Sequence, residues 1–177
     1  MSARRLLAVL LMIAAAAAGT QAGGLLDDGA DDTRAGGVAG AGEAGVGRVV
    51  KVVDGDTIHV LLGAEREKVR YIGVDTPETK DPRRGVQCYG PQASQFNAAL
   101  VGGEQVRLVR DVRERDRYGR LLAYVYRVRD GLFVNAELAR LGYAQPLSIA
   151  PDVRHAKRFA ALARAARAAG RGLWSAC

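Results

Sequence analysis

The sequence predicts a mainly β domain of the α+β class, in which five strands are interspersed with three helices. Three observations support this: five short runs rich in β-branched residues, three helix patterns bounded by proline or glycine, and a hydrophobic content of 49% in 177 residues, enough for a core. Periodicity leaves two architectures open. One is a small closed or partly open barrel with helices packed around it, and the other is an open α+β sheet.

The residues before position 48 are expected to lie outside this domain. Two arginines precede an apolar run of 13 residues at 6–18, and small residues stand at the −3 and −1 positions of a cleavage site after Ala22. This predicts a signal peptide over residues 1–22 and a secreted or periplasmic protein without stable membrane association after cleavage; an uncleaved membrane anchor is the less favoured alternative. Residues 23–47, mostly Gly, Ala and Asp, predict a linker, and the folded domain is expected over residues 48–177.

Five strands are expected from their β-branched residues and the turn signals between them. They cover residues 49–53, 57–61, 69–74, 106–109 and 121–128. Asp54-Gly55 is the turn signal between the first two.

Three helices are expected because proline is favoured at the first helical position and glycine just after the last. They follow Gly90-Pro91 as far as Gly102, cover residues 135–141, and run from Pro151-Asp152 to about Ala169. An OB-type barrel, which commonly binds oligonucleotides, accommodates these elements. An open sheet fits nearly as well.

The charge of the domain favours a polyanionic partner. The chain has a net charge of +7, and residues 48–177 hold 23 basic and 14 acidic side chains. Such a domain attracts nucleic acids by electrostatic steering and counterion release. Charge alone is equally compatible with a basic soluble protein that has no such partner.

Three short charged motifs carry the candidate chemistry. They are Asp-Gly-Asp-Thr at 54–57, Arg-Tyr-Ile-Gly-Val-Asp-Thr-Pro-Glu at 70–78 and Asp-Arg-Tyr-Gly-Arg at 116–120. They supply carboxylates for a divalent cation, one further carboxylate able to act as a base, and arginines for a phosphate. Because the group contains no Cys or His, calcium is favoured over zinc. Each motif alone is also compatible with a solvated turn or a surface ion pair.

One spacing argues against a single site. Arg70 stands five residues before Asp75, and an odd spacing on a straight strand places two side chains on opposite faces. The two can meet only if the strand ends or bulges between them.

The chain has two cysteines, Cys88 and Cys177. In an exported protein an even number of cysteines favours a disulfide, with two free thiols as the alternative.

From about Val49 to Trp174 the chain closely resembles the staphylococcal nuclease (thermonuclease) family. The resemblance is carried by the three motifs with their flanking residues, at 52–58, 69–78 and 116–126, by Gly-Leu-Phe-Val-Asn at 131–135 and by Gly-Leu-Trp at 172–174. All of these occur in the family's order and spacing.

The resemblance implies an OB-type five-stranded β-barrel with three helices. It also implies calcium-dependent hydrolysis of phosphodiester bonds in DNA and RNA, with single strands preferred, 3′-phosphorylated products and a monomeric enzyme. A nucleic-acid-binding module of the same fold without activity is the alternative, although such members usually lack part of the catalytic set. An exported structural protein that binds cell-wall polyanions has no support beyond charge.

The resemblance also assigns roles to single residues. It places Arg70, Glu78 and Arg120 at catalytic positions. Asp56, Asp75 and the Thr76 carbonyl fall at calcium ligands, with Asp54 just outside them. Arg117 and Tyr118 fall at positions that contact a substrate phosphate, and Ser148 falls where the type member has a tyrosine near the base. The pair Cys88 and Cys177 resembles that of exported bacterial relatives, and its effect is expected on stability rather than catalysis.

Overall fold

The computed structural model describes residues 42–79 and 85–177. The expected signal peptide and most of the expected linker lie outside the described residues. In the part of the chain that is described, no helix is both long and apolar enough to cross a membrane.

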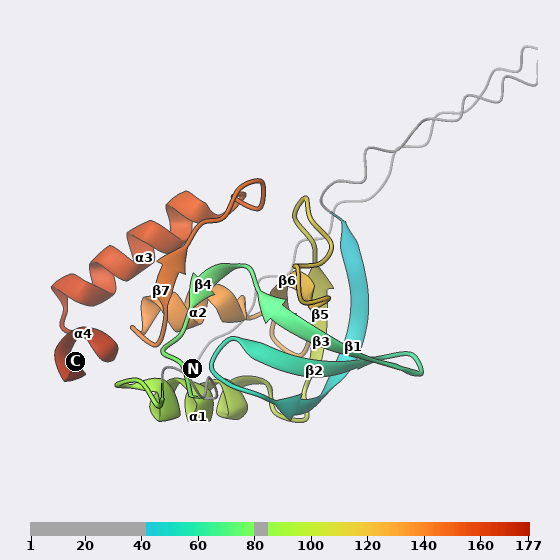
Figure 1. The fold of residues 1–177 in the computed structure, drawn as a ribbon, viewed down its shortest axis with the longest axis horizontal. Coiled ribbons are helices and arrows are strands. Elements are labelled where there is room, and N and C mark those ends of the chain that lie inside the picture. The colour runs from blue at the N-terminus through green and yellow to red at the C-terminus, as the bar shows by residue number, and fades with distance from the viewer. Residues whose placement is uncertain (1–41, 80–84) are drawn as a thin grey trace, which may run out of the picture. The chain divides into compact units, whose positions relative to one another are not determined.

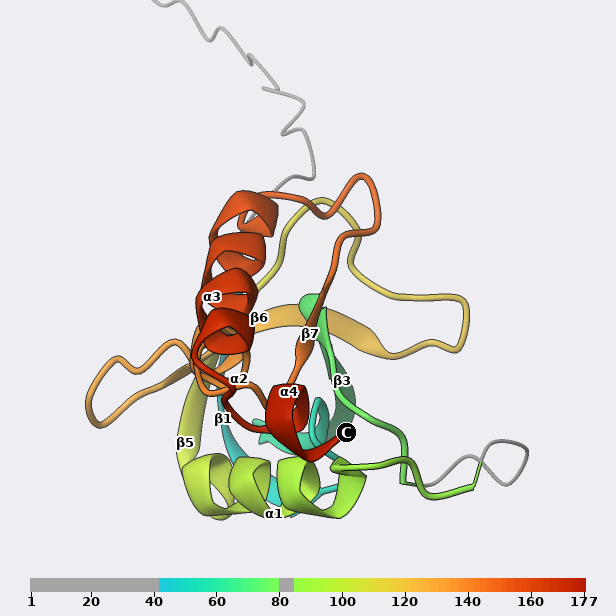
Figure 2. The ribbon, with the colours of Figure 1, turned by 90° about the vertical axis from the view of Figure 1, so that its left-hand side faces the viewer.

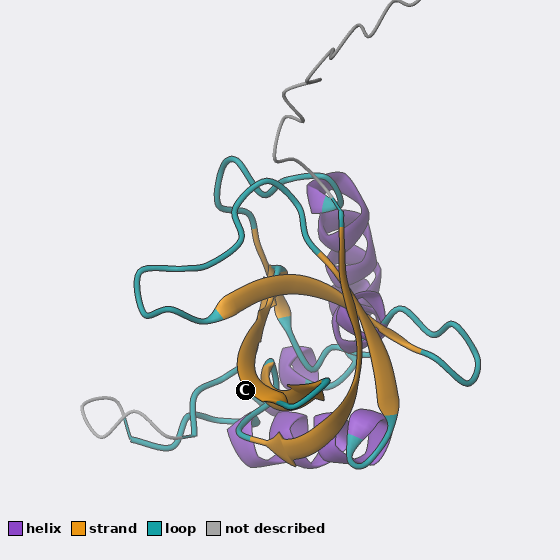
Figure 3. Cartoon of the chain, turned by 90° about the vertical axis from the view of Figure 1, so that its right-hand side faces the viewer, coloured by secondary structure: helices purple, strands orange, loops and turns teal. Residues whose placement is uncertain are grey.

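Five strands close into a barrel with helices outside it (Figures 1 and 3). In hydrogen-bonded order the strands are β1 (Glu43–Val52), β2 (Thr57–Leu62), β3 (Glu65–Tyr71), β6 (Leu121–Arg127) and β5 (Gln105–Val109), and β5 pairs with β1. Only β3 and β6 are parallel among these barrel neighbours. The predicted barrel is confirmed, and the open sheet is excluded.

The strand that closes the barrel starts earlier than expected. The first half of β1 pairs with β5, from Glu43 opposite Val109 to Arg48 opposite Gln105, and the second half pairs with β2. β1 therefore begins before the boundary expected at residue 48. The glycine content that suggested a linker has a packing reason, because a Cβ at Gly47 would lie 2.6 Å from the Val60 side chain.

The third expected strand, 69–74, is in fact two strands. β3 ends at Tyr71, and β4 (Gly73–Asp75) leaves the barrel to pair with β7 (Gln145–Leu147). Gly73 has a φ of +82°, which L side chains rarely adopt, and a Cβ there would collide with the ring of Phe159. The chain therefore turns at Gly73, and this turn shapes the site described below.

Three helices correspond to the predicted ones, and a fourth is short. They are α1 (Gly90–Val101), α2 (Val134–Arg140), α3 (Ala156–Ala168) and α4 (Leu173–Ala176). α1 lies along one end of the barrel, while α3 lies outside it next to β7 (Figures 1 and 2). The prediction that α3 begins at Pro151-Asp152 is wrong, because α3 begins at Ala156. The Asp152 carboxylate instead accepts hydrogen bonds from the backbone nitrogens of Val112 and Arg113, in the loop between β5 and β6.

The core fills the barrel and continues under α3. Its fully buried members include Ile58, Val60, Val69, Val106, Leu108, Ala123 and Val125. Tyr124, Phe133 and Phe159 extend the core toward α3, with ring centroids 5.9 Å apart for Tyr124–Phe133 and 5.6 Å for Phe133–Phe159.

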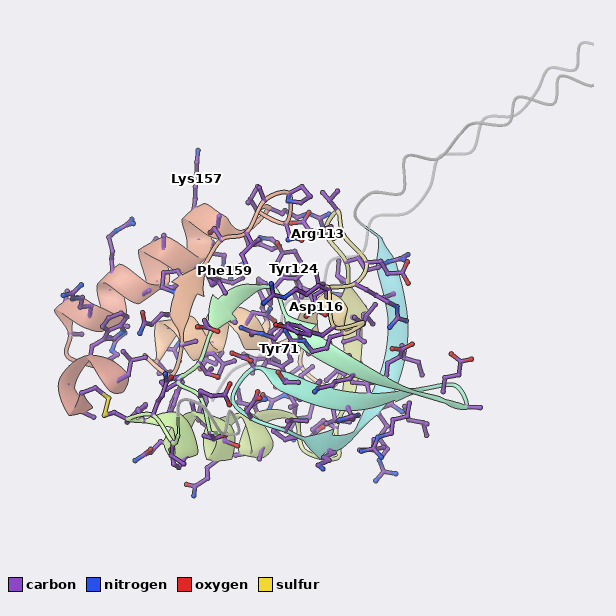
Figure 4. The ribbon with its side chains drawn as sticks, in the orientation of Figure 1. Tyr71, Arg113, Asp116, Tyr124, Lys157 and Phe159 are labelled. Carbon is purple, nitrogen blue, oxygen red and sulfur yellow. A yellow bond between two sulfur atoms is a disulfide. The ribbon has the colours of Figure 1, made fainter. Side chains whose placement is uncertain are left out.

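Cys88 and Cys177 form a disulfide, as predicted, with Cα atoms 6.0 Å apart. The bond joins the segment before α1 to the end of α4, and the sulfur atoms are visible in yellow in Figure 4.

Candidate active site

The turn between β1 and β2 presents a nearly buried carboxylate. Asp56 is 5% exposed, and its Oδ2 accepts hydrogen bonds from the backbone nitrogen of Thr76 at 2.7 Å and from the Thr76 hydroxyl at 2.9 Å. A Cβ at Gly55 would lie 2.7 Å from the Thr76 side chain, so only glycine lets the two segments approach this closely. The turn thus joins Asp56 to the segment that follows β4.

Arg70 joins the two expected calcium-binding carboxylates. Its guanidinium lies 2.8 Å from Asp56 Oδ1 and 2.6 Å from Asp75 Oδ1, and it also donates to the Val74 carbonyl at 3.0 Å. The spacing problem is resolved by the turn at Gly73, which brings Asp75 back toward the side chain of Arg70. With only 12% of its side chain exposed, Arg70 is held in a defined orientation.

Asp54 lies beside this cluster, where its charge is disfavoured. Its Oδ1 accepts a hydrogen bond from the Asp56 backbone nitrogen at 3.1 Å. Burial, and then the neighbouring Asp56 carboxylate, raise the pKa of Asp54 to about 6.

Two residues that sequence reasoning missed hold this turn in place. Asn97 on α1 donates a hydrogen bond to the Asp54 carbonyl at 3.0 Å and accepts one from the Tyr71 hydroxyl, also at 3.0 Å. Asn97 is fully buried. A buried amide inside an apolar helix pattern is the signal that could have identified it, because such a group requires partners.

Glu78 lies close enough to the cluster for its charge to act on Asp75. Burial raises the pKa of Asp75, the charges of Asp56 and Glu78 raise it further, and Arg70 opposes them. The Glu78 carboxylate accepts a hydrogen bond from the Thr79 backbone nitrogen at 2.8 Å, and its own backbone nitrogen donates to the Gln87 side chain at 2.7 Å.

Arg120 is oriented by a turn before β6. Asp116 Oδ1 accepts hydrogen bonds from the backbone nitrogens of Tyr118 and Arg120, and Asp116 Oδ2 accepts one from Arg120 Nε at 2.6 Å. Burial raises the pKa of Asp116, but the Arg120 hydrogen bonds and the nearby backbone N–H groups bring it below its ordinary value. Asp116 therefore stays ionised and holds the guanidinium.

Arg117 and Tyr118 form an exposed pair on the same turn. Arg117 lies over the Tyr118 ring, 4.8 Å from its centroid, and donates a hydrogen bond to its hydroxyl at 2.6 Å. Tyr118 is 66% exposed, so both side chains are accessible to a ligand.

A pocket of about 470 Å³ brings Arg70 together with the 116–120 turn. It is lined by Arg70, Arg117, Tyr118 and Arg120, and also by Arg113 and Arg115, which sequence reasoning did not select. Figure 4 labels Arg113, Asp116 and Tyr71, three of the residues that line it. Ser148, which the resemblance put near the base, does not line it, whereas its neighbours Leu147 and Ile149 do. Five arginines against two aspartates make this pocket suitable for an anion.

Asp75 and Thr76 line a second pocket, of about 390 Å³. Arg70, which lines the first pocket, is bonded to Asp75, which lines the second, so the two pockets are connected through this ion pair. The structure brings together Asp54, Asp56, Arg70, Asp75 and Thr76 through direct contacts, and it places Arg120 in a pocket shared with Arg70. Glu78 acts on this group through its charge, which raises the pKa of Asp75.

The donor chemistry fits a hard divalent cation. Asp54, Asp56 and Asp75 provide only oxygen ligands; Asp56 and Asp75 both bond Arg70, and Asp54 lies beside Asp56. Within residues 42–79 and 85–177, no three Asp, Glu, His or Cys side chains converge on one point. The two carboxylates that share a partner are Asp56 and Asp75, both bonded to Arg70. Arg70 competes for the same carboxylates.

Residues 68–176 match the model of the staphylococcal nuclease homologue family. The chain belongs to the staphylococcal nuclease family. The resemblance found in the sequence is confirmed, and the OB-type barrel is the fold expected for this family.

Individual staphylococcal nuclease relatives resemble most of the domain. Identity to the thermonuclease of Staphylococcus hyicus is 38% over 128 residues, which cover 72% of this chain and 75% of that protein. Identity to the endonuclease YncB of Bacillus subtilis is 39% over 127 residues, 71% of this chain and 59% of that one. The thermonuclease of Staphylococcus intermedius is 43% identical over 107 residues, 60% of this chain and 62% of that protein.

Proposed function

We propose that the protein is a calcium-dependent secreted nuclease that hydrolyses phosphodiester bonds of DNA and RNA and leaves 3′-phosphorylated ends. One observation carries the proposal: Arg70 bonds the Asp56 and Asp75 carboxylates and also lines the arginine-rich pocket that contains Arg120. A cation site and a phosphate site are thereby adjacent. The names of the relatives, thermonuclease and endonuclease, support the same reaction class.

Asp56, Asp75 and the Thr76 carbonyl are the residues proposed to hold Ca²⁺, with Asp54 beside them. When bound, the ion supplies Lewis-acid polarisation of the scissile phosphate. Asp54 contributes charge without contacting the ion. Burial first, and then the neighbouring Asp56 carboxylate, raise the pKa of Asp54, and a bound cation would offset both effects.

Glu78 is proposed to orient or deprotonate the attacking water. Glu78 lies close enough to Asp75 for its charge to raise the pKa of that carboxyl. A carboxylate beside a polarised phosphate, rather than in the ligand set, can accept the proton that the water loses.

Arg70 and Arg120 are proposed to neutralise the charge that develops on the phosphoryl oxygens. Both guanidiniums are oriented by carboxylates, Arg70 by Asp56 and Asp75 and Arg120 by Asp116. Donors that are already oriented need no reorganisation during the reaction, which is the basis of electrostatic catalysis. Arg117 and Tyr118 are proposed to contact a neighbouring phosphate of the strand.

The substrate is proposed to be a single strand and the enzyme a monomer. The exposed ring of Tyr118, which lines the arginine-rich pocket, offers a stacking surface for an unpaired base. The disulfide, together with the expected signal peptide, favours an oxidising compartment, either the periplasm or the exterior of the cell.

The experiment is a digest of single-stranded DNA and of RNA by the mature protein, with calcium, with magnesium and with excess chelator. We expect cleavage in calcium, less in magnesium because that ion demands tighter octahedral geometry, and none in chelator. Glu78→Gln should lower turnover by about 10²–10⁴-fold, and Glu65→Gln, at an exposed position on β3, is the matched control. Undiminished cleavage in chelator contradicts the proposal, and tight binding without cleavage in calcium indicates a binding module.

A further inference from the structure

Gln87, in the segment before α1, forms two hydrogen bonds with the backbone of Glu78. The Glu78 nitrogen donates a hydrogen bond to Gln87 Oε1 at 2.7 Å, and the Gln87 nitrogen donates one to the Glu78 carbonyl at 2.8 Å. Both backbone groups of Glu78 are therefore bonded to a single residue. Glu78 stands three positions after Asp75, so these bonds hold it next to the carboxylate cluster.

Gln87 is itself held by the start of α1. The Gly90 nitrogen donates a hydrogen bond to the Gln87 carbonyl at 3.0 Å. A Cβ at Gly90 would lie 2.9 Å from the Glu78 carbonyl oxygen, so the first residue of α1 packs directly on the Glu78 backbone. Between them, Tyr89 adopts a φ of 66°, uncommon for a residue other than glycine, and its ring stacks on Tyr143 at 5.4 Å.

The disulfide holds the residue that directly follows Gln87. Cys88, the next residue, is bonded to Cys177, which follows α4. α4 is anchored in turn, because the Leu173 nitrogen donates to the Gly142 carbonyl at 2.9 Å and the Leu173 side chain is 6% exposed. The residue next to Gln87 is thus linked by the disulfide to a packed part of the fold.

The disulfide lines the same pocket as Asp75 of the carboxylate cluster. The cavity has a volume of about 390 Å³, and Asp75 and Thr76 line it together with Gln87, Cys88 and Cys177. A displacement of Gln87 and Cys88 would therefore change the shape of the pocket that Asp75 and Thr76 line.

We propose that Gln87 is a positioning residue for Glu78, and that the Cys88–Cys177 disulfide holds Gln87 in place, so that turnover as well as stability depends on the intact disulfide. The inference rests on the proposed function, in which Glu78 acts on the attacking water. Misplacement of a catalytic group by about 1 Å can cost about 10²-fold in rate. Binding should change little, because the arginines of the first pocket are oriented by other carboxylates.

The variants separate the hydrogen bond from the bulk of the side chain. Gln87→Met keeps the length but removes the acceptor for the Glu78 nitrogen, and Gln87→Glu keeps an acceptor. Gln95→Met, at an exposed position on α1, is the matched control. We expect Gln87→Met to lower kcat at least tenfold with KM within twofold, Gln87→Glu to recover most of the loss, and Gln95→Met to match the wild type.

Reduction tests the covalent part. Dithiothreitol breaks the S–S bond by two thiol exchanges, which leave two thiols on the protein and a cyclic disulfide on the reagent. In calcium, and well below the melting temperature, we expect kcat of the reduced wild type to fall several-fold with KM unchanged. The effects of reduction and of Gln87→Met should be less than additive, because they act on one contact. The double variant Cys88→Ser/Cys177→Ser should not respond to the reagent.

A second measurement does not depend on activity. Amide hydrogen exchange at Glu78 should speed up in Gln87→Met and in the reduced protein, but not in Gln95→Met. If both changes lower the melting temperature while kcat stays at the wild-type value, the positioning role is overturned. If the oxidised wild type cleaves nothing, the proposed function fails, and the exchange rate at Glu78 alone decides whether Gln87 holds it.

Discussion

At the scale of single residues, Arg70 is the centre of the candidate site. Its guanidinium is almost buried, and it is bonded to two carboxylates and a backbone carbonyl. Removing one partner of such a group leaves the others without compensation, which is costly in a buried setting. Arg70 therefore has a structural role as well as a proposed catalytic one. Its substitution would lower stability and turnover together, and the two effects could not be separated.

Substitution of Arg120 separates the structural role from the proposed catalytic role better. Arg120 is more exposed than Arg70, and its carboxylate partner among the described residues is Asp116. Arg120→Lys should lower kcat by about 10²-fold or more, since an ammonium cannot replace a fork that bonds Asp116 through Nε and still presents two further nitrogens. Steady-state kinetics in calcium is the measurement. Arg66→Lys, at an exposed position on β3, is the control, and near-wild-type turnover of Arg120→Lys would remove this residue from the proposed mechanism.

His155 should make stability depend on pH. Burial and the nearby charges of Arg154 and Arg158 lower its pKa below the ordinary value of 6.5, against the weaker opposing effect of Asp111. In the window just below pH 6.5 the unfolded chain then binds more protons than the folded one, so His155 makes stability fall as the pH falls. We expect His155→Phe, which keeps a ring beside Tyr124, to gain stability relative to the wild type on going from pH 7 to pH 5. Urea unfolding at the two pH values measures this, and a constant difference between the proteins would contradict it.

At the scale of elements, two loops form the outer wall of the arginine pocket and are locked together. Asp152 accepts hydrogen bonds from the backbone nitrogens of Val112 and Arg113, at 3.0 and 2.8 Å, and from Arg113 Nε at 2.7 Å. In the opposite direction, Asp111 of the first loop accepts a hydrogen bond from the backbone nitrogen of Arg154 in the second, at 3.0 Å. These exchanges fix the loop before β6 against the loop before α3.

Asp152→Ala should loosen this wall. The carboxylate is 4% exposed, so its removal leaves two backbone N–H groups without their partner, and we expect a loss of about 1.5–3 kcal/mol in unfolding free energy. KM for single-stranded DNA should rise more than kcat falls. Glu114→Ala removes an exposed carboxylate from the same segment and is the control. Equal effects of the two variants would mean that Asp152 does not lock the loops.

At the scale of the whole molecule, the disulfide encloses half of the chain, with a sequence separation of 89. Loop-closure entropy predicts that Cys88→Ser/Cys177→Ser lowers the unfolding free energy by about 4–5 kcal/mol, an upper figure because residual structure in the unfolded state reduces it. Urea unfolding of the oxidised protein and of the double variant is the measurement. An unchanged midpoint would indicate that the packing of α4 alone secures the C-terminus.

The barrel depends on residues that look unstructured by composition. The first five residues of β1, 43–47, are rich in Gly and Ala, yet they pair with β5 and close the sheet. No local signal marks them as a strand, because their glycines serve close packing against β2 rather than strand propensity. The turn at Gly73 escaped detection for a similar reason, since its need for glycine arises from Phe159, distant in the sequence.

The sequence by itself determined the class of the fold, most of the strands and helices, the three charged motifs and, through the order of those motifs, the family. These follow from local patterns and from residue types whose chemistry is restricted, such as carboxylates without Cys or His. Only the tertiary structure decided that the barrel closes and that Arg70 meets Asp75. It alone revealed that Asn97 supports the Asp54 turn and that Gln87 holds Glu78. Each of these depends on contacts between segments far apart in the chain or on a backbone turn forced by such a contact. A local pattern can mark a residue that needs a partner, as it does for Asn97, but it does not identify that partner.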